Sequence, residues 1–330
     1  MQVFDDKGLV FRAKEELFVD AHGIKNKEAL ITHAHSDHAK PTKSNSYYMT
    51  QETASLIDAE KRNLNVKKIP FKKKFSLGEF ECSFHSSGHI LGSAQVEINN
   101  SANAVLTSDF KLQKSILFDG AEILPSEILV IETTFGTSEY KFPARDVVYE
   151  DMMKWMNFQS RKNHFIVLGG YSTGKAQELT KIVNEFMNET PLVYKKIFDQ
   201  NKIYENEGVK LGNYLELNHN LKDSNILIMP PHLINDDLLS VLQLQLGKKV
   251  ECAIATGWRA SKYKTFPLSD HADYYDLLEY VKNSNPKLVL TTHGFEEEFA
   301  KSVQRKLKIN ARPLSKAGQK TIAEFSSVLS

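Results

Sequence analysis

Four side chains that commonly bind metal ions lie close together in residues 33–38, which read His-Ala-His-Ser-Asp-His. If a strand ends here, His33 and His35 point to the same face, because side chains two residues apart on an extended chain do so. Asp37 and His38 follow in the turn and can serve a second ion nearby. Imidazole and carboxylate are ligands of zinc, or of manganese where oxygen donors dominate. The spacing therefore predicts a site for two divalent ions.

Two later residues are candidates to complete the ligand set. His89 lies between Gly88 and Gly92, which allow the backbone to approach a site closely. Asp109 follows the apolar run 104–107, where a buried carboxylate is costly unless it meets a cation. Each residue alone is more often a structural group. Because they follow residues 33–38 in this order, we expect both to be metal ligands.

A glycine-rich loop at residues 169–175, Gly-Gly-Tyr-Ser-Thr-Gly-Lys, precedes an amphipathic segment. Such a loop at the start of a helix presents free backbone N–H groups to an anion. Ala176 stands where an ATP-binding loop needs Ser or Thr after its lysine, so an ATP site is not expected. Two interpretations remain: Ser172, Thr173 and Lys175 contact the backbone of a nucleic acid, or the loop is a structural hinge between two lobes.

The elements that must position these residues alternate between strands and helices. Alternating or continuous apolar residues predict strands at 9–11, 17–19, 29–32, 80–84, 95–98, 104–107, 128–131, 165–168 and 288–291. Helical spacing predicts helices at 51–60, 147–158, 175–186 and 296–307. This order favours an α/β sandwich in two parts, 1–169 and 256–330, interrupted by an inserted α/β unit at 170–255.

Composition and charge narrow the class of protein. The chain has 330 residues, a net charge of +1 and 41% hydrophobic residues, so it lacks the overall basicity of many nucleic-acid-binding proteins. Lysines at 67–68 and 72–74 form either a local binding patch or solvated surface. The two cysteines, the lack of an apolar leader and the lack of an apolar run of about 18 residues predict a cytoplasmic protein outside the membrane.

The HxHxDH motif, followed by Gly-His and a strand-terminal Asp, resembles the metallo-β-lactamase superfamily. Three later segments resemble motifs A, B and C of its β-CASP nucleases, through Glu132 in IETTFG, His271 in LSDHADY and His293 in TTHG. Residues 174–179, GKAQEL, resemble the helix that opens the β-CASP cap domain. The resemblance covers residues 8–314 and implies a metallo-β-lactamase αββα sandwich with an inserted β-CASP cap.

The resemblance also implies roles for the site residues. It assigns the first ion to His33, His35, His89 and Asp109, and the second to Asp37, His38, His293 and the shared Asp109. A hydroxide held between two such ions, with Asp37 as a catalytic ligand, is the expected nucleophile, because each ion lowers the pKa of water.

Three further residues have implied catalytic roles. His271 is expected to act as general acid, with Glu132 orienting its ring and favouring its protonated form. Asp20 matches the family's first motif and is expected to hold a metal-binding histidine from behind. The alternatives are structural: a loop histidine, a strand-end glutamate and a turn aspartate.

The same resemblance leaves the nucleic acid open between DNA and RNA. His293 is typical of RNA-acting members, whereas the Thr-Gly-Trp segment at 256–258 resembles the DNA crosslink-repair branch. The overall pattern is most similar to DNA ligase-associated exonucleases. It implies a 5′ to 3′ exonuclease on single-stranded DNA in repair, with a DNA ligase or helicase as partner. The alternative is a ribonuclease like the archaeal relatives described as mRNA 3′-end processing factors. Tyr171, Trp258 and Tyr274 could stack on bases, although such aromatic residues more often pack in the core or at the rim of a cleft.

Two other classes of function compete with a nuclease. A small-molecule hydrolase of the same fold would not need Glu132, His271 or an inserted cap, so these features favour the nuclease. A non-catalytic nucleic-acid-binding subunit would be expected to have lost metal ligands, whereas here the ligand set is intact.

Overall fold

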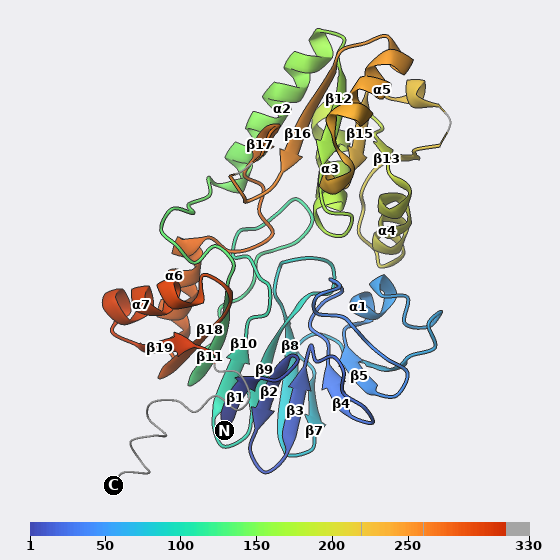
Figure 1. The fold of residues 1–330 in the computed structure, drawn as a ribbon. Coiled ribbons are helices and arrows are strands. Elements are labelled where there is room, and N and C mark those ends of the chain that lie inside the picture. Colours follow the sequence, from blue (N-terminus) through green and yellow to red (C-terminus); the bar gives the residue numbers. More distant parts are fainter. Residues whose placement is uncertain (219, 260, 315–330) are drawn as a thin grey trace.

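A computed structural model describes residues 1–218, 220–259 and 261–314, which form two lobes (Figure 1). We call the lower one the sandwich lobe and the upper one the cap lobe. Two sheets build the sandwich lobe. The first has the strand order β1 (Gln2–Asp5), β2 (Leu9–Arg12), β3 (Glu16–Val19), β4 (Glu28–Leu30), β5 (Ser46–Met49) and β6 (Asn65–Lys68). The second has the order β19 (Asn310–Pro313), β18 (Leu288–Gly294), β11 (Ile128–Thr133), β10 (Asn103–Leu106), β9 (Ala94–Asn99), β8 (Phe80–Ser86) and β7 (Lys74–Leu77).

The two sheets pack face to face around one apolar core. Phe11 and Val19 from the first sheet and Phe84 and Val96 from the second are buried in the same cluster. Alternate residues of a strand point to opposite faces, so each sheet has a second face to cover.

Helices cover both outer faces of the sandwich. Helix α1 (Gln51–Leu56) packs on the first sheet, and α6 (Tyr274–Ser284) and α7 (Glu296–Leu307) pack on the second. Thr50 and Asp273 accept hydrogen bonds from the first turns of α1 and α6, which defines where these helices begin. The layers confirm the predicted αββα sandwich.

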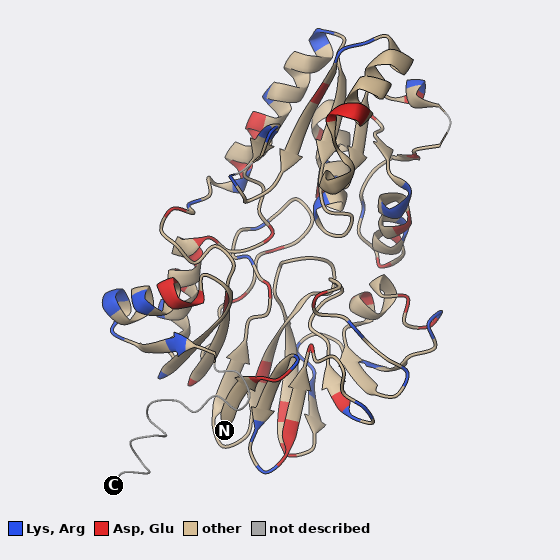
Figure 2. Cartoon of the chain, in the orientation of Figure 1, with Lys and Arg blue, Asp and Glu red and all other residues tan. Residues whose placement is uncertain are grey.

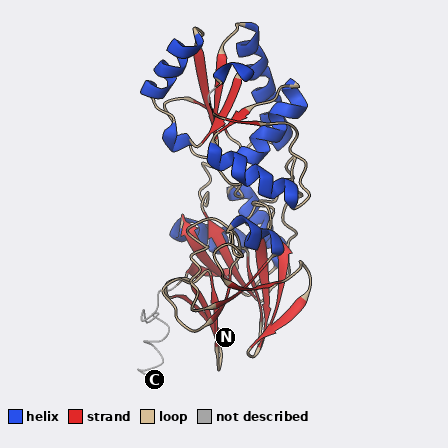
Figure 3. Ribbon diagram, turned by 90° about the vertical axis from the view of Figure 1, so that its right-hand side faces the viewer, coloured by secondary structure: helices blue, strands red, loops and turns tan. Residues whose placement is uncertain are grey.

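The cap lobe is a parallel sheet covered by helices on both sides, as Figure 3 shows. Its strand order is β14 (Leu215–Glu216), β13 (Leu192–Val193), β15 (Ile226–Met229), β12 (Phe165–Gly169), β16 (Val250–Ala255) and β17 (Lys264–Phe266). Its helices are α2 (Arg145–Arg161), α3 (Lys175–Ile182) with a π-helical turn at Val183–Met187, α4 (Lys195–Asn206), α5 (Asp236–Leu246) and two 3₁₀ turns at Leu221–Asp223 and Pro231–Leu233. Strands β12 and β15 are buried at every position, because a parallel sheet is covered on both faces.

The inserted unit extends beyond the predicted segment 170–255 at both ends. Strand β12 pairs with β15 and β16, and β17 pairs with β16, so all of these strands belong to the cap sheet. Helix α2 packs against the same sheet. The predicted boundary at residue 169 wrongly placed strand β12 in the sandwich part. An apolar run predicts a strand but does not indicate which other strands it pairs with. In the structure the inserted unit runs from about α2 to β17.

The parallel strands of both lobes end at the same gap between them. In the sandwich lobe, β10, β11 and β18 run parallel, and in the cap lobe β12, β15 and β16 do so. Loops that follow the carboxyl ends of parallel strands are common places for ligand sites. Within the described ranges, no helix combines the length and apolarity needed to cross a bilayer.

Candidate metal centre and cleft

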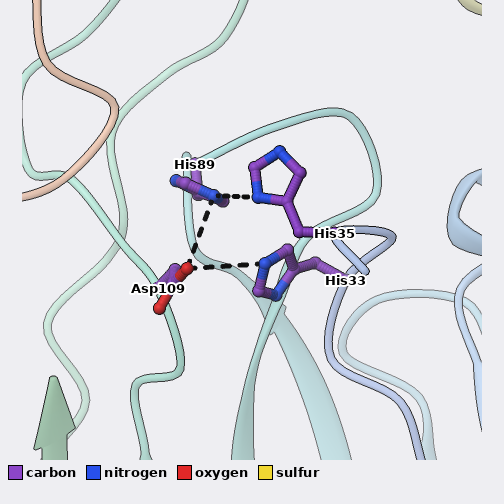
Figure 4. A group of neighbouring side chains, drawn as sticks. All are labelled: His33, His35, His89 and Asp109. Atoms are coloured by element: carbon purple, nitrogen blue, oxygen red, sulfur yellow. Dashed lines mark hydrogen bonds and ion pairs between the residues drawn. The ribbon is translucent and has the colours of Figure 1, made fainter. Parts of the chain in front are cut away.

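Four of the predicted ligands converge at the carboxyl ends of the sandwich strands (Figure 4). His33 and His35 follow β4, His89 lies in the loop between β8 and β9, and Asp109 follows β10. One ligand atom from each residue lies within 4.8 Å of the others. Asp109 Oδ2 is 3.5 Å from His33 Nε2 and 3.7 Å from His89 Nε2. The structure thus brings together residues from three separate loops.

A second group lies next to the first and shares Asp109 with it. His38 Nε2 is 3.6 Å from Asp109 Oδ2 and 3.8 Å from Asp37 Oδ2. The ring of His293, which belongs to the last part of β18, stacks on His38 with 5.4 Å between centroids. This group is more open than the first, because the Asp37 side chain is 72% exposed. Asp109 therefore lies where one carboxylate could serve two ions.

An oxygen behind each of four histidines holds one ring nitrogen and leaves the other directed into the site. Such partners fix the orientation and tautomer of metal-binding imidazoles. These contacts are His33 Nδ1 with Thr32 Oγ1 at 3.1 Å, His35 Nε2 with the Thr173 carbonyl at 3.3 Å, His38 Nδ1 with Asp20 Oδ2 at 2.8 Å, and His89 Nδ1 with the Asp270 carbonyl at 2.9 Å.

The chemistry of this donor set fits divalent cations. His33 Nε2 is buried and has no hydrogen-bond partner among the described residues. An unsatisfied buried polar atom costs about 1–3 kcal/mol, and a bound cation would remove that cost. Burial lowers the pKa of His33 and His89, which keeps both imidazoles neutral, as ligation requires. Burial also lowers the pKa of His38, but Asp109 and Asp20 outweigh it and raise that pKa to about 10, so an ion at His38 would have to displace its Nε2 proton.

Three residues at the site have a left-handed backbone conformation, which residues other than glycine rarely adopt. Asp20, Ser108 and His293 have φ values of 51°, 50° and 56°, in the left-handed region. Such residues persist where the surroundings hold them, and they concentrate at functional sites. The Asp20 carboxylate accepts hydrogen bonds from Thr32 N and Oγ1 at 2.8 and 2.6 Å, and Ser108 Oγ lies 2.7 Å from Thr32 Oγ1. These contacts, with that to His38, place Asp20 behind the candidate ligands His33 and His38.

His271 and Glu132 form a pair beside the first ligand group. Glu132 Oε1 accepts a hydrogen bond from His271 Nδ1 at 2.9 Å, and its carboxylate also accepts from the backbone N–H groups of Phe110 and Thr134 at 3.2 Å. Burial lowers the pKa of His271, but the buried Glu132 carboxylate raises it to about 9. The His271 ring lies 4.8 Å from that of His89. This raised pKa favours the protonated form of the His271 imidazole beside the first ligand group.

A cleft of about 640 Å³ opens from these residues between the lobes. Tyr171, Ser172 and Thr173 line its cap side, together with Trp258, whose ring packs on Phe135 at 4.8 Å. The position of Ser172, Thr173 and Trp258 is compatible with a role in nucleic-acid binding. A polymer that enters this cleft would pass both lobes.

The structure corrects one predicted nucleic-acid contact, Lys175, and places the aromatic candidate Tyr274 in the core, which was the alternative for it. Lys175 borders the cleft, but its side chain is only 3% exposed and its Nζ pairs with Asp270 Oδ2 at 2.8 Å. Its charge is therefore used inside the protein and is not free for a phosphate. Tyr274 is buried, with its ring against Phe299, so it cannot stack on a base. Both residues follow loops in the sequence, and exposure could not be inferred from that position.

The glycine-rich loop is built as a structural connection. The Gly174 N–H donates to Gln177 Oε1 at 2.6 Å, and the Ala176 N–H donates to the Tyr171 carbonyl at 3.0 Å. The first turn of α3 therefore has these donors satisfied internally instead of presenting them to an anion. Thr173 contacts His35 through its carbonyl, so the loop joins the lobes at the metal centre. These contacts favour the hinge interpretation.

Lys and Arg residues alternate with Asp and Glu along much of the chain (Figure 2), and most of the lysines at 67–68 and 72–74 have acidic neighbours. Four of them pair with glutamates at 2.7 to 3.6 Å: Lys67 with Glu28, Lys68 with Glu60, Lys72 with Glu122, and Lys74 with Glu81. Solvated surface is thus the better description of this region.

Sequence reasoning did not assign several residues that hold the site in place. Thr32 and Ser108 contact His33, and the Asp270 carbonyl holds His89. Each of the three is next to a predicted ligand or acid in the sequence, and Asp270 also lies in the quoted LSDHADY motif. Their position directly before His33, Asp109 and His271 could have identified them as supporting residues. Arg145 and Lys111, which lie near Asp270, gave only the weaker signal of a charge beside apolar residues.

Comparisons with known proteins agree with this geometry. Residues 259–314 match the family described as "Zn-dependent metallo-hydrolase RNA specificity domain". The chain is 31% identical over 88% of its length to a protein named "Probable DNA ligase" from Opitutus terrae, covering 29% of that protein. It is 23% identical over 83% of its length to an "RNase J-like protein" from Methanocaldococcus jannaschii, covering 70% of it. It is also similar to "Transcription termination factor FttA" from Methanothermobacter thermautotrophicus, at 25% identity over 59% of the chain and 36% of that protein.

A solved structure shows the same fold along nearly the whole chain. It is a crystal structure of a protein of unknown function from Enterococcus faecalis V583, with a TM-score of 0.62 and 14% identity over 96% of this chain and 98% of that one. The chain spans only about a third of the DNA ligase and FttA relatives that it matches. The motifs, the sandwich with its inserted cap, the histidine–aspartate cluster and these matches lead to one assignment. The chain belongs to the metallo-β-lactamase/β-CASP nuclease family.

Proposed function

We propose that the protein is a metal-dependent phosphodiesterase that cleaves nucleic acid in the cleft between its lobes. The observation that carries this proposal is the His271–Glu132 pair beside the histidine–aspartate cluster, with 2.9 Å between Nδ1 and Oε1. A protonated imidazole next to a cation-binding group suits a reaction in which a leaving oxygen must gain a proton. The cap lobe supplies a second wall for an extended substrate.

The proposed ligand sets are those expected from the sequence. We assign one ion to His33, His35, His89 and Asp109, and a second to Asp37, His38, His293 and Asp109. Zinc is proposed first because imidazole dominates the set, with manganese as the alternative. When bound, such ions supply an activated water and offset negative charge that develops on the phosphate.

The protein's own residues would divide the remaining work. His271 would donate the proton on its Nε2 to the leaving oxygen, while Glu132 holds Nδ1 and favours the protonated ring. Asp20 would hold His38 in the tautomer that directs Nε2 to the site. Trp258, exposed at the cleft and backed by Phe135, is positioned to stack on a base of a single strand.

We propose single-stranded DNA as the substrate, with exonucleolytic cleavage from the 5′ end in repair. The match to a DNA ligase relative across 88% of this chain supports DNA. A DNA ligase or a helicase is accordingly the proposed partner. The two cysteines, Cys82 and Cys252, are free and buried, which suits the reducing cytoplasm proposed as the location.

RNA is the second candidate substrate, on separate observations. The matched family description names RNA specificity for residues 259–314, and the RNase J-like relative is covered over 70% of its length. A ribonuclease would use the same site residues, because the phosphodiester bond is common to both polymers.

Labelled substrates test the proposal. Zinc- or manganese-loaded protein is incubated with single-stranded DNA and RNA of the same sequence, each labelled at the 5′ or the 3′ end. We expect mononucleotide release from the 5′ end of DNA and slower or no cleavage of RNA. Cleavage of RNA alone would reverse the substrate assignment. Inertness of metal-loaded protein toward both polymers would rule out the nuclease.

A further inference from the structure

Five charged side chains are buried together where the two lobes meet, beside the metal centre. We call them the interlobe charge cluster; each is at most 7% exposed. The sandwich lobe contributes one lysine, the cap lobe contributes three residues from α2 and α3, and the last lies in the segment that returns from β17 to α6. In chain order they are Lys111, Arg145, Lys175, Glu178 and Asp270. Charges at this depth are costly unless they are paired.

Asp270 is the centre of this cluster. Its carboxylate receives Lys175 Nζ at 2.8 Å, Arg145 Nη2 at 3.4 Å and Lys111 Nζ at 3.7 Å. Arg145 also donates from Nη1 to the Ser269 carbonyl at 2.6 Å, and it forms a two-pronged pair with Glu178 at 2.8 and 2.5 Å. Cations from both lobes thus hold the Asp270 side chain, and Arg145 also holds the main chain at Ser269.

The same short segment reaches the metal centre. The Asp270 carbonyl accepts the hydrogen bond from His89 Nδ1 at 2.9 Å, and the next residue is His271. Lys111 Nζ also lies 3.4 Å from the His89 carbonyl. Arg145, on the first turn of a cap helix, is therefore one residue removed from the group that orients a metal ligand.

We propose that the interlobe charge cluster is a positioning device that couples the seating of the cap lobe to the geometry of the metal site. Arg145 and Lys175 hold Asp270 from the cap side, and Asp270 holds the His89 ring. The inference rests on the proposed metal centre. None of the five cluster residues is a ligand in that centre, so the cluster acts on the ions only through His89 and the adjacent His271.

Simple attachment of the lobes does not require this cluster. An apolar cluster that includes Ile90, Leu91, Tyr204 and Leu211 already joins them. Glu207, just after α4, also bridges the lobes, because it accepts hydrogen bonds from Ser55 Oγ at 2.5 Å and Gln51 Nε2 at 3.2 Å. Buried ion pairs are weak stabilisers compared with apolar contacts of the same volume. The Glu207 contact provides a control for lobe attachment.

Zinc retention in two variants separates positioning from attachment. Arg145→Lys keeps the charge but loses the planar fork that contacts Ser269, Asp270 and Glu178 together. We expect it to lower zinc affinity about tenfold in chelator competition, as removal of outer partners of metal ligands does. The absorption spectrum of the cobalt-loaded protein should change as well, because it reports ligand geometry. Glu207→Gln should match the wild type in both measurements.

Circular dichroism and thermal unfolding without metal establish that each variant is folded. If Arg145→Lys does not fold, Lys175→Gln tests the same carboxylate and should lower zinc affinity in the same direction. Folded cluster variants with wild-type zinc affinity and cobalt spectrum would overturn the inference, and so would an equal loss in Glu207→Gln. A wild-type protein that retains no zinc would instead overturn the proposed metal centre, which is a distinguishable outcome.

Discussion

The metal centre and the interlobe charge cluster are both buried polar groups, but they are balanced in different ways. In the cluster, three cations surround the carboxylates of Asp270 and Glu178, so each charge has a partner inside the protein. In the metal centre, three neutral or weakly basic imidazoles face a single carboxylate, and His33 Nε2 has no hydrogen-bond partner in the described part of the chain. The charges of the interlobe charge cluster are therefore balanced within the protein, whereas the metal centre needs a bound cation to balance its ligands.

This difference gives a practical rule for recognising a site. Burial and charge occur in both groups, so neither property alone identifies function. The distinguishing feature is a set of ligand atoms that are each held from behind and still lack a partner in front. His33 fits that description, because Thr32 Oγ1 contacts its Nδ1 and its Nε2 has no hydrogen-bond partner among the described residues, whereas every charge in the cluster is paired.

The largest expected effect comes from removing an open ligand of the metal centre. Asp37→Ala should abolish turnover and reduce bound metal, because Asp37 lies 3.8 Å from His38 across the proposed second ion. The side chain is 72% exposed, so the free energy of unfolding without metal should change by no more than about 0.5 kcal/mol. Metal analysis and substrate assays measure both effects. Asp119→Ala, which removes another exposed carboxylate, is the control. Normal metal content in Asp37→Ala would contradict the ligand assignment.

A smaller effect is expected from His271→Ala, which should leave metal content intact. Loss of a general acid lowers turnover by about 10²- to 10⁴-fold. Single-turnover cleavage of a labelled strand measures the rate, and metal analysis checks the ions. His164→Ala, in the cap lobe and paired with Gln159, serves as control. Metal loss in the His271 variant would assign this residue to the ligand set instead.

Glu132→Gln should move the pH profile. Burial lowers the pKa of His271 and Glu132 raises it to about 9, so the acid form that donates a proton is present below that pH and lost as pH rises through it. Without the carboxylate, we expect activity to fall at a pH about 1–3 units lower. The rate at low pH should change much less than in His271→Ala. An unmoved alkaline limb would show that Glu132 does not set the protonation of His271.

The smallest effect is expected outside both polar groups, at the exposed wall of the cleft. Trp258→Ala should weaken binding of a single strand by about 1 kcal/mol, or about fivefold in KM, through loss of one stacked base. The turnover number should stay near the wild-type value, because Trp258 does not contact the proton donor or the ligands. Trp258→Phe should restore most of the binding. A loss in turnover number without a change in KM would assign Trp258 a different role.

The metal centre was predictable from the sequence to the extent that its residues are local. His33, His35, Asp37 and His38 lie within one turn, and the strands before Asp109 and His293 have clear apolar patterns. The sandwich was predicted from those patterns as well, because the apolar residues of each strand indicate which of its positions are buried. Family resemblance then supplied the order of the remaining motifs.

The parts that failed depend on contacts between distant segments. In the sequence, Lys175 resembles an exposed lysine after a loop. In the fold it is buried against Asp270, which lies 95 positions later in the sequence. The cap boundary was misplaced because strand β12 carries no mark of its partners β15 and β16. The role of Asp270 was missed for the same reason, because its carbonyl meets His89 only in the folded chain.

Anomalous scattering at the zinc absorption edge, from crystals of zinc-loaded protein, tests the central distinction most directly. We expect one peak among His33, His35, His89 and Asp109, a second between Asp109 and His38, and none within the interlobe charge cluster. Zinc-loaded crystals without a peak at the histidine cluster would contradict the account, whatever activity the protein shows.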